Sequence, residues 1–258
     1  MDILTFNELQ AVAAIFRADE SGEPSAFLGT CFAFRQKDCF LTANHCVADV
    51  DGLRESDRST SAIERRRQTI PEAELFIVHP YIKKILRVQE VIRHKTADIA
   101  LVRSDPIESE DAHAFLICTS DYSLGTECAA YGFSKTIFGD APDQPIARLF
   151  KCYFQRFMSY ESLPLGYSYE AAELNIACPS GLSGGPVFRT DRKMVICGLV
   201  TENLTSATAR NPIEETQKGA VITKVYRTDI NYGVCLLLAD VKDWLNEHIP
   251  KPRKTDKG

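Results

Sequence analysis

The sequence lacks the features that would direct it to a membrane or onto nucleic acid. No apolar run approaches the roughly 18 residues that a membrane-spanning helix needs. Its 30 basic residues are outnumbered by 35 acidic ones, giving a formal net charge of −5, so it has no basic excess of the kind that binds phosphates. We therefore expect neither a membrane nor a nucleic acid as partner.

Signals for export and for metal binding are missing as well. The start of the chain carries Asp2 and Glu8 where the basic segment of a signal peptide would lie. Its nine cysteines are odd in number and spread along the chain, and their spacing matches no usual zinc pattern. We therefore expect reduced thiols, a cytoplasmic location, no metal and no organic cofactor.

The composition otherwise matches that of an average globular protein. Of the 258 residues, 45% are hydrophobic and 25% are charged, which excludes a disordered chain, a collagen and a coiled coil. No internal repeat or low-complexity linker divides the sequence. We predict one folded unit over residues 1–249, without placing a boundary inside it, and a disordered basic tail over residues 250–258.

Short apolar runs punctuated by Gly, Pro, Asp, Asn and Ser dominate the chain. Residues 27–34, 98–103, 127–133 and 194–203 are examples, and they are rich in Val, Ile, Phe, Leu and Cys. Many short strands at this spacing are typical of an all-β sandwich or barrel rather than of alternating strands and helices.

Three stretches depart from this pattern. Residues 2–16 fit a short helix, and residues 239–249 have the apolar spacing of an amphipathic helix. Residues 51–72 are polar and include three consecutive arginines, Arg65–Arg67. We interpret this third stretch as a long exposed loop, and a patch for an anionic partner is the alternative.

Three motifs carry residue types suited to acyl transfer. Ser183 lies between glycines in GLSGGP, where a turn can expose a hydroxyl and gather main-chain N–H groups. His45 lies at the end of an apolar strand in LTANHC, and Asp98 begins another in ADIALV, where burial would require a partner for its charge. Each motif alone also fits a simpler interpretation: a glycine-rich hairpin loop, a packed or surface histidine, and a strand-capping aspartate.

Taken in order, the motifs resemble those of the chymotrypsin/trypsin-fold serine peptidases. LTANHC is similar to that family's TAAHC, ADIALV to its DIALL, and GLSGGP to its GDSGGP. Residues 195–201 resemble the strand that lines the substrate cleft, and residues 232–245 resemble the last strand and the C-terminal helix. The resemblance implies an all-β fold of two six-stranded antiparallel β-barrels followed by a C-terminal α-helix.

The resemblance also assigns catalytic roles. Ser183 would be the nucleophile, His45 the general base and then the acid, and Asp98 the group that orients the imidazole. The main-chain N–H groups of Gly181 and Ser183 would form the oxyanion hole. The implied activity is that of a serine endopeptidase that hydrolyses protein substrates through an acyl-enzyme. A catalytically idle barrel that presents its cleft to a partner is the alternative.

The same comparison predicts a specificity pocket. Ala177 would lie at its floor, six residues before the nucleophile, and Asn203 and Gly233 on its walls. Thr201 would take the place of a family serine that contacts the triad aspartate. An uncharged floor favours a small or medium apolar residue before the scissile bond. A basic preference stays open, because four acidic residues lie within reach in the sequence: Glu202, Glu214, Glu215 and Asp229.

Two departures from the secreted members concern regulation and disulfides. The residue before the nucleophile is Leu182, which cannot pair with a newly cut N-terminus as the family's aspartate does. The first strand is expected near Leu9–Phe16, so N-terminal cleavage is not the expected switch, and a regulatory protein partner stays open. Cys31 is the nearest candidate to pair with Cys46, with unpaired core thiols as the alternative. Leaderless domains of this type resemble effectors of bacterial stress or phage defence.

Overall fold

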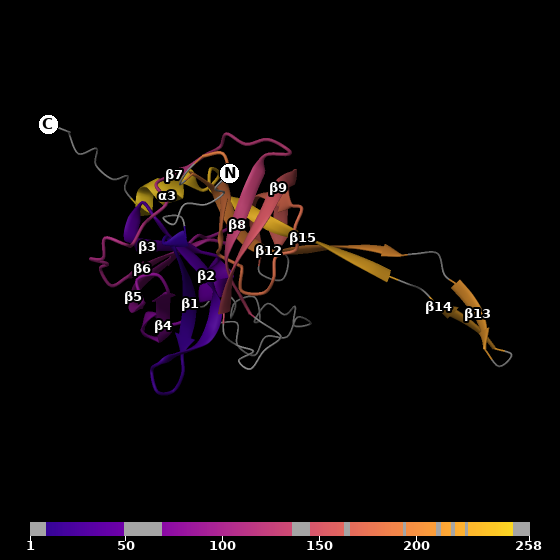
Figure 1. Ribbon diagram of the computed structural model, residues 1–258, viewed down its shortest axis with the longest axis horizontal. Helices are drawn as coiled ribbons and strands as arrows, with labels where there is room; N and C mark the ends of the chain where they lie inside the picture. The colour runs from indigo at the N-terminus through magenta and orange to yellow at the C-terminus, as the bar shows by residue number, and fades with distance from the viewer. Residues whose placement is uncertain are drawn as a thin grey trace.

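Six strands of the N-terminal half close into an antiparallel barrel (Figure 1). The structure is a computed structural model that describes residues 9–48, 69–135, 145–162, 166–192, 195–209, 213–217, 220–224 and 227–249. The six strands are β1 (Val12–Ala18), β2 (Pro24–Phe34), β3 (Gln36–Thr42), β4 (Leu75–His79), β5 (Lys84–Arg93) and β6 (Ala100–Ser104). Their order around the barrel is β1-β2-β3-β6-β5-β4, and β4 pairs back onto β1.

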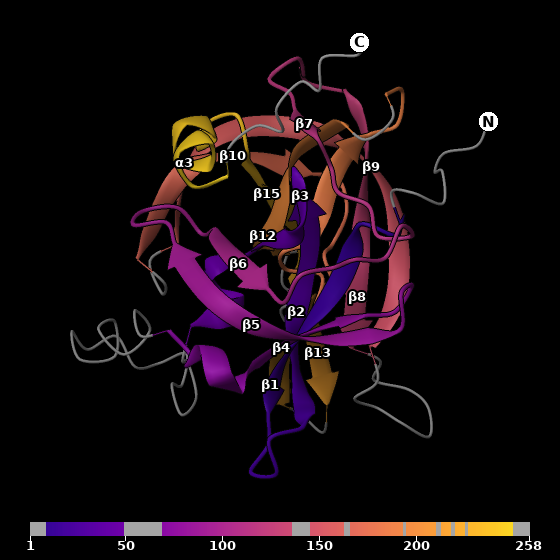
Figure 2. The same cartoon turned by 90° about the vertical axis from the view of Figure 1, so that its left-hand side faces the viewer.

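The interior of this first barrel is filled by the apolar runs of the sequence. Phe32, Phe40, Leu41, Ile77 and Leu101 are fully buried. Adjacent residues of a strand face opposite sides, so the burial of both Phe40 and Leu41 means that both faces of β3 are covered, one by the barrel interior and the other by the rest of the protein. Figure 2, which looks onto this barrel, shows β1, β2, β3 and β6 packed side by side around that core.

The second barrel is built from the C-terminal half. Its strands are β8 (Glu127–Lys135), β9 (Pro145–Ser162), β10 (Tyr167–Leu174), β11 (Pro186–Arg189), β12 (Val195–Ala209) and β15 (Arg227–Leu237). The ring of six closes because β11 pairs with both β8 and β12, and the short β7 (Ile117–Cys118) joins β12 in parallel. The predicted double-barrel fold is thus confirmed.

Cysteine is a major component of this second core. Five thiols pack in one apolar cluster: Cys128, Cys152, Cys178, Cys197 and Cys235. All nine cysteines of the chain are unpaired in the structure. A small, apolar thiol fills a core position much as alanine or valine does.

Two strands of the second barrel continue well beyond it. β12 and β15 stay paired from Asn203↔Gly233 out to Ala209↔Arg227. Near their tip, β13 (Ile213–Gln217) pairs with β14 (Ala220–Lys224). We call residues 203–209 and 227–233, together with β13 and β14, the arm. Figure 1 shows the arm projecting away from both barrels.

The predicted closing helix is present as α3 (Lys242–His248). It packs on the first barrel, where Arg35 donates hydrogen bonds to the carbonyls of Leu245 and Ile249 at 3.3 and 2.5 Å. The Trp244 ring lies 5.4 Å from that of His94, in the turn that leads to Asp98. The closing helix therefore packs against the first barrel and braces it.

The prediction of a helix over residues 2–16 is wrong for its second half. Val12–Ala18 forms β1, because each residue from Val12 to Ile15 is buried between neighbours on β2 and β4. A helix would have turned half of these side chains to solvent. The expected strand near Leu9–Phe16 is the better interpretation. The arginines at 65–67 and the tail at 250–258 lie outside the described residues.

Within the part of the chain that the structure describes, no helix is both long and apolar enough to cross a bilayer. In the same residues, no three or more His, Cys, Asp or Glu side chains gather in a way that would hold a metal ion.

Candidate active site

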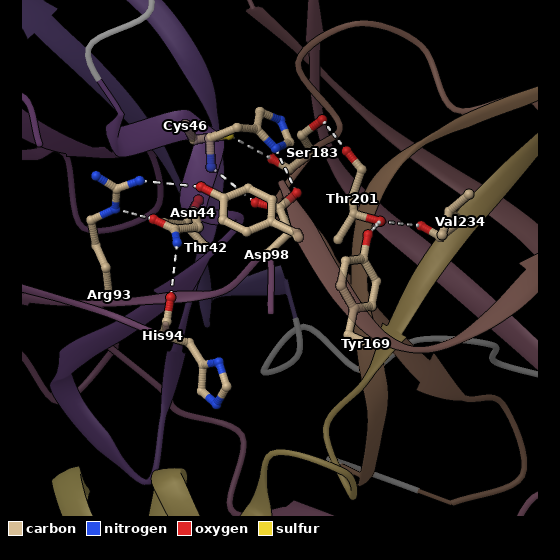
Figure 3. A network of polar contacts seen from close by, with 12 residues as sticks. Thr42, Asn44, Cys46, Arg93, His94, Asp98, Tyr169, Ser183, Thr201 and Val234 are labelled. Carbon is tan, nitrogen blue, oxygen red and sulfur yellow. Dashed lines mark hydrogen bonds and ion pairs between the residues drawn. The ribbon is translucent and has the colours of Figure 1, made fainter. Parts of the chain in front are cut away.

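The three motif residues come together between the two barrels. His45 lies in the 3₁₀ helix η1 (Asn44–Val47), directly after β3, and Asp98 lies just before β6. Because Thr42 on β3 pairs with Ala100 on β6, both side chains emerge at the same barrel edge. Ser183 comes from the turn before β11 in the second barrel, and Figure 3 shows it in the same cluster of side chains as Asp98.

His45 and Asp98 are joined by two hydrogen bonds. The Nδ1 of His45 lies 2.7 Å from Asp98 Oδ2, and the His45 main-chain N–H donates to Asp98 Oδ1 at 3.0 Å. The Asp98 side chain is fully buried, whereas that of His45 is 24% exposed. Burial lowers the pKa of His45, but the Asp98 carboxylate and the neighbouring Cys46 outweigh it and hold that pKa well above its ordinary value. Nδ1 donates to the carboxylate, so Nε2 remains to accept a proton.

Ser183 adopts a conformation in which its hydroxyl is turned from the histidine. Its Oγ donates to the Thr201 carbonyl at 2.9 Å, and among the described residues it forms no hydrogen bond with His45. The Thr201 hydroxyl also has other partners: it accepts from Tyr169 at 3.0 Å and donates to the Val234 carbonyl at 3.2 Å (Figure 3). The expected contact of this hydroxyl with Asp98 is therefore not made.

The turn before Ser183 presents two main-chain donors. Leu182 N–H donates to the Pro179 carbonyl at 3.0 Å, and Gly181 has a φ of +94° at the third position, as a type II turn requires. A Cβ at Gly181 would also strike the Phe27 ring. Within the described residues, neither the Gly181 nor the Ser183 N–H has an acceptor, so both are available to an oxyanion. Leu182 itself is fully buried.

Thr30 ties this turn to the first barrel, and the sequence motifs do not include it. Its N–H donates to the Ser183 carbonyl at 2.9 Å, and its Oγ1 donates to the Gly181 carbonyl at 2.8 Å. The same Oγ1 accepts from the Phe133 N–H at 2.9 Å, while Thr42 Oγ1 donates to the Thr30 carbonyl at 2.7 Å. One buried hydroxyl thus fixes the oxyanion turn. The only sequence signal is a polar residue inside an apolar run.

The residue that faces Cys46 is Gly29, not Cys31. A Cβ placed on Gly29 would lie 2.5 Å from Cys46 Sγ and 3.5 Å from Cys46 Cβ. The disulfide partner suggested by the resemblance is therefore displaced by two residues, onto a position without a side chain. Cys31 and Cys46 are both buried free thiols, and Cys46 Sγ lies 3.7 Å from the Ser183 carbonyl.

Both expected walls of the specificity pocket, Asn203 and Gly233, are hydrogen-bonded to the segment that carries Ala177. Asn203 Oδ1 accepts from the Cys178 N–H at 2.7 Å, and Asn203 Nδ2 donates to the Cys178 carbonyl at 2.5 Å. Gly233 N–H donates to the Ile176 carbonyl at 2.5 Å, which holds the same segment from the other side. Ala177, between these two anchors, is exposed. Asn203 and Gly233 thus bind the residues on either side of Ala177.

The four acidic residues considered for a basic pocket are placed differently. Glu202 lies beside Thr201, its Oε1 is buried without a hydrogen-bond partner in the described residues, and burial raises its pKa. Asp229 is exposed on the arm, where it pairs with Ala207. Glu214 and Glu215 lie on β13 near the tip of the arm. Of the four, Glu202 is the one next to the site.

A second polar network supports η1 and was not predicted. Arg93 donates to Asn44 Oδ1 and, at 3.1 Å, to the Tyr167 hydroxyl. Asn44 Nδ2 in turn donates to the His94 carbonyl at 3.2 Å (Figure 3). Asn44 directly precedes His45, so this network links the histidine to both barrels. A hollow of about 360 Å³ lies next to these residues.

Comparisons with known proteins agree with this geometry. The family described as a trypsin-like peptidase domain matches residues 29–196, which include all three motifs. No curated protein matches the sequence. The fold is similar to the active form of the Rv3671c protease from M. tuberculosis, with 12% identity, 98% of this chain and 86% of that one covered, and a TM-score of 0.59.

Two further solved structures share the fold. The HtrA-type protease AlgW with a decapeptide has 13% identity, covers 95% of this chain and 68% of its own, and gives a TM-score of 0.59. Kallikrein-related peptidase 10 in complex with Zn²⁺ has 11% identity, covers 95% of this chain and 98% of its own, and gives a TM-score of 0.57. At these identities the likeness concerns the fold.

Proposed function

Because this chain belongs to the trypsin-like peptidase family, we propose that it is a serine endopeptidase that hydrolyses protein substrates. The observation that carries the proposal is the 2.7 Å contact between His45 Nδ1 and the fully buried Asp98 carboxylate, opposite the glycine turn that presents Ser183. A buried carboxylate bonded to one ring nitrogen fixes the tautomer whose other nitrogen is basic.

The first half of the reaction forms the acyl-enzyme. Ser183 Oγ rotates from the Thr201 carbonyl toward His45 Nε2, gives its proton to that nitrogen and attacks the scissile carbonyl carbon. The carbonyl oxygen becomes an oxyanion, which the Gly181 and Ser183 N–H groups stabilise. As the tetrahedral intermediate collapses, the C–N bond breaks and the imidazolium returns the proton to the leaving amine.

The second half releases the acyl group by the same steps. A water molecule replaces the amine, loses its proton to His45 Nε2 and attacks the ester carbon. The oxyanion again binds the two N–H groups of the turn. The ester C–O bond then breaks, the acid product leaves, and the proton returns to Ser183 Oγ. These steps use only side chains and main-chain groups of the protein.

We further propose a small or medium apolar residue before the scissile bond. Ala177 and Asn203 are uncharged and the Asn203 amide is already bonded to Cys178, so a buried Arg or Lys there would need a counter-charge. Cleavage of an unfolded protein, with the products mapped by mass spectrometry, tests this preference. Cuts mainly after Arg or Lys would contradict it and would implicate Glu202.

Our proposal for the cellular setting is a cytoplasmic effector of bacterial stress or phage defence. Its support is that all nine cysteines are free thiols, as is usual in a reducing compartment. Leu182, which is fully buried, stands in place of the aspartate that pairs with a newly cut terminus in the secreted members, which favours control by a protein partner over N-terminal cleavage. Mapping new protein N-termini in cells that express the wild type or Ser183→Ala tests the role and reveals substrates.

A catalytically idle binding module is the second candidate, favoured by the hydrogen bond that holds Ser183 Oγ on the Thr201 carbonyl. A fluorophosphonate probe distinguishes the two. An active Ser183 becomes labelled while Ser183→Ala does not, and no labelling of the wild type would support the idle module. Labelling of both proteins at one rate would place the reactive group elsewhere.

A further inference from the structure

The arm is continuous with the candidate active site. β12 passes Thr201, whose carbonyl lies 2.9 Å from Ser183 Oγ, and runs on as the arm from Asn203 to Ala209. The two parts belong to one strand, although its register against β15 shifts between Val200 and Asn203, as at a β-bulge. A ligand that lies along β12 at the site can therefore continue along the arm.

One edge of the arm has no partner strand in the described residues. β15 covers one edge of β12 out to Ala209. On the other edge, β11 pairs only with Ile196 to Leu199, and β7 pairs with Val195 and Ile196. Along residues 203–209, a length of about 23 Å, every second residue then points its N–H and C=O groups to this uncovered edge. Such an edge is a template for another extended chain.

This unpaired edge is the one on which Ser183 lies. Gly184 N–H donates to the Val200 carbonyl at 2.7 Å, and Val200 N–H donates to the Gly185 carbonyl at 2.8 Å, so the serine turn adjoins β12 away from β15. The outer edge of β15 leads instead to β10, which pairs with Gly233. Of the arm's two outer edges, that of β12 leads to the nucleophile.

We propose that the arm lengthens the substrate-binding edge of β12, so that the substrate chain, on the N-terminal side of its scissile bond, continues as an added antiparallel strand along residues 203–209. The proposal rests on the proposed peptidase function and states how far along the chain an extended protein substrate is recognised. With pairing residue by residue from Thr201 to Ala209, about nine residues before the scissile bond are recognised. Main-chain hydrogen bonds along the arm supply affinity that does not depend on the side chain in the specificity pocket.

The experiment compares peptides that share one mapped cleavage site but carry three, six or nine residues before it. A matched variant replaces residues 205–231 by Asn-Gly, a two-residue turn that joins the paired neighbours Leu204 and Tyr232. For the wild type we expect kcat/KM to rise at least tenfold from three to nine residues. For the shortened variant we expect a ratio near one. Equal ratios in the two proteins would overturn the proposal.

A second measurement needs no change to the protein. N-methylation removes one N–H donor, and alternate residues of a strand face the partner edge. Methylating the fifth to eighth residues before the bond one at a time should weaken cleavage at every second position. Equal effects at all four positions would argue against strand addition. Binding of the same peptides to Ser183→Ala, measured by fluorescence anisotropy, tests the edge without turnover.

The outcomes separate this inference from the proposed function. Labelling of Ser183 by the fluorophosphonate with no dependence on peptide length would overturn the arm proposal alone. If the fluorophosphonate does not label Ser183, but N-methylation weakens peptide binding at every second position in the anisotropy measurement, the peptidase function is overturned and the arm remains a peptide-binding edge. Wild-type dimers that dissociate when the arm is shortened, and that peptides do not disrupt, would show a second copy as its occupant.

Discussion

Replacing Thr30 with valine tests whether one buried hydroxyl holds the oxyanion turn. Valine keeps the shape of the side chain and loses the hydrogen bond to the Gly181 carbonyl at 2.8 Å. It also leaves the Phe133 N–H, which donates to the same oxygen at 2.9 Å, without an acceptor. Thr30 is fully buried, so water does not replace the lost partner.

The size of the effect follows from the two groups left unsatisfied. Each buried unsatisfied group costs about 1–3 kcal/mol, so we expect Thr30→Val to lower the free energy of unfolding by about 2–6 kcal/mol. Because Gly181 carries one oxyanion donor, and full loss of such a donor costs about 100- to 1000-fold in kcat, a loosened turn should slow fluorophosphonate labelling by about 10- to 100-fold.

Thr30→Ser is the matched control, because it restores the hydroxyl and removes only a methyl group. We expect its labelling rate to stay within about threefold of the wild type, with a modest loss of stability from the deleted methyl. Urea unfolding and labelling of all three proteins give both numbers. If Thr30→Val and Thr30→Ser label at the same rate, Thr30 has no role in positioning the turn.

Three further outcomes are expected. Since the Asp98 carboxylate raises the pKa of His45, the rising limb of kcat/KM against pH should lie above pH 6.5, and a limb below pH 6 would contradict this. Asp98→Asn should lower kcat by about four orders of magnitude. Burial lowers the pKa of His79 to about 4, so stability should fall by roughly 3 kcal/mol from pH 6.5 to 4 as the unfolded state takes up the proton, and unfolding of His79→Phe in urea should lose this slope. The cysteine of Gly29→Cys should form a disulfide with Cys46, because a Cβ at position 29 would lie 3.5 Å from Cys46 Cβ, a separation that suits a disulfide. Thiol titration should then count eight free thiols in Gly29→Cys and nine in the control Gly29→Ser, whereas ten free thiols in Gly29→Cys would contradict the prediction.

The strands that could be predicted from the sequence are those buried in the barrels. Runs such as residues 27–34 and 127–133 are nearly all apolar because both neighbouring strands and the core cover them. β5 could not be predicted in this way, because Lys84–Arg93 contains mostly exposed or half-exposed residues and only a few buried ones. The same holds for the arm: residues 203–209 are mostly polar, and pairing with β15 rather than burial holds them as a strand.

The site shows the same division between local and distant signals. His45, Asp98 and Ser183 each lie in a short motif that can be read from adjacent residues. Thr30 acts on Gly181, 151 positions away, and no local pattern marks it. The choice of Gly29 rather than Cys31 opposite Cys46 depends on the offset between two strands, which composition and spacing do not determine.

The reactivity of the buried thiols can report when each barrel opens. Burial raises the pKa of Cys178 to about 12 and holds those of Cys31 and Cys235 well above their ordinary value, so these thiols react with alkylating reagents only after the surrounding barrel loosens. Cys31 lies in the first core and the other two lie in the second. Mass spectrometry after a timed pulse of iodoacetamide therefore times the opening of each barrel separately. Because His45 and Ser183 come from different barrels, the same measurement also shows how long the two halves of the site stay together.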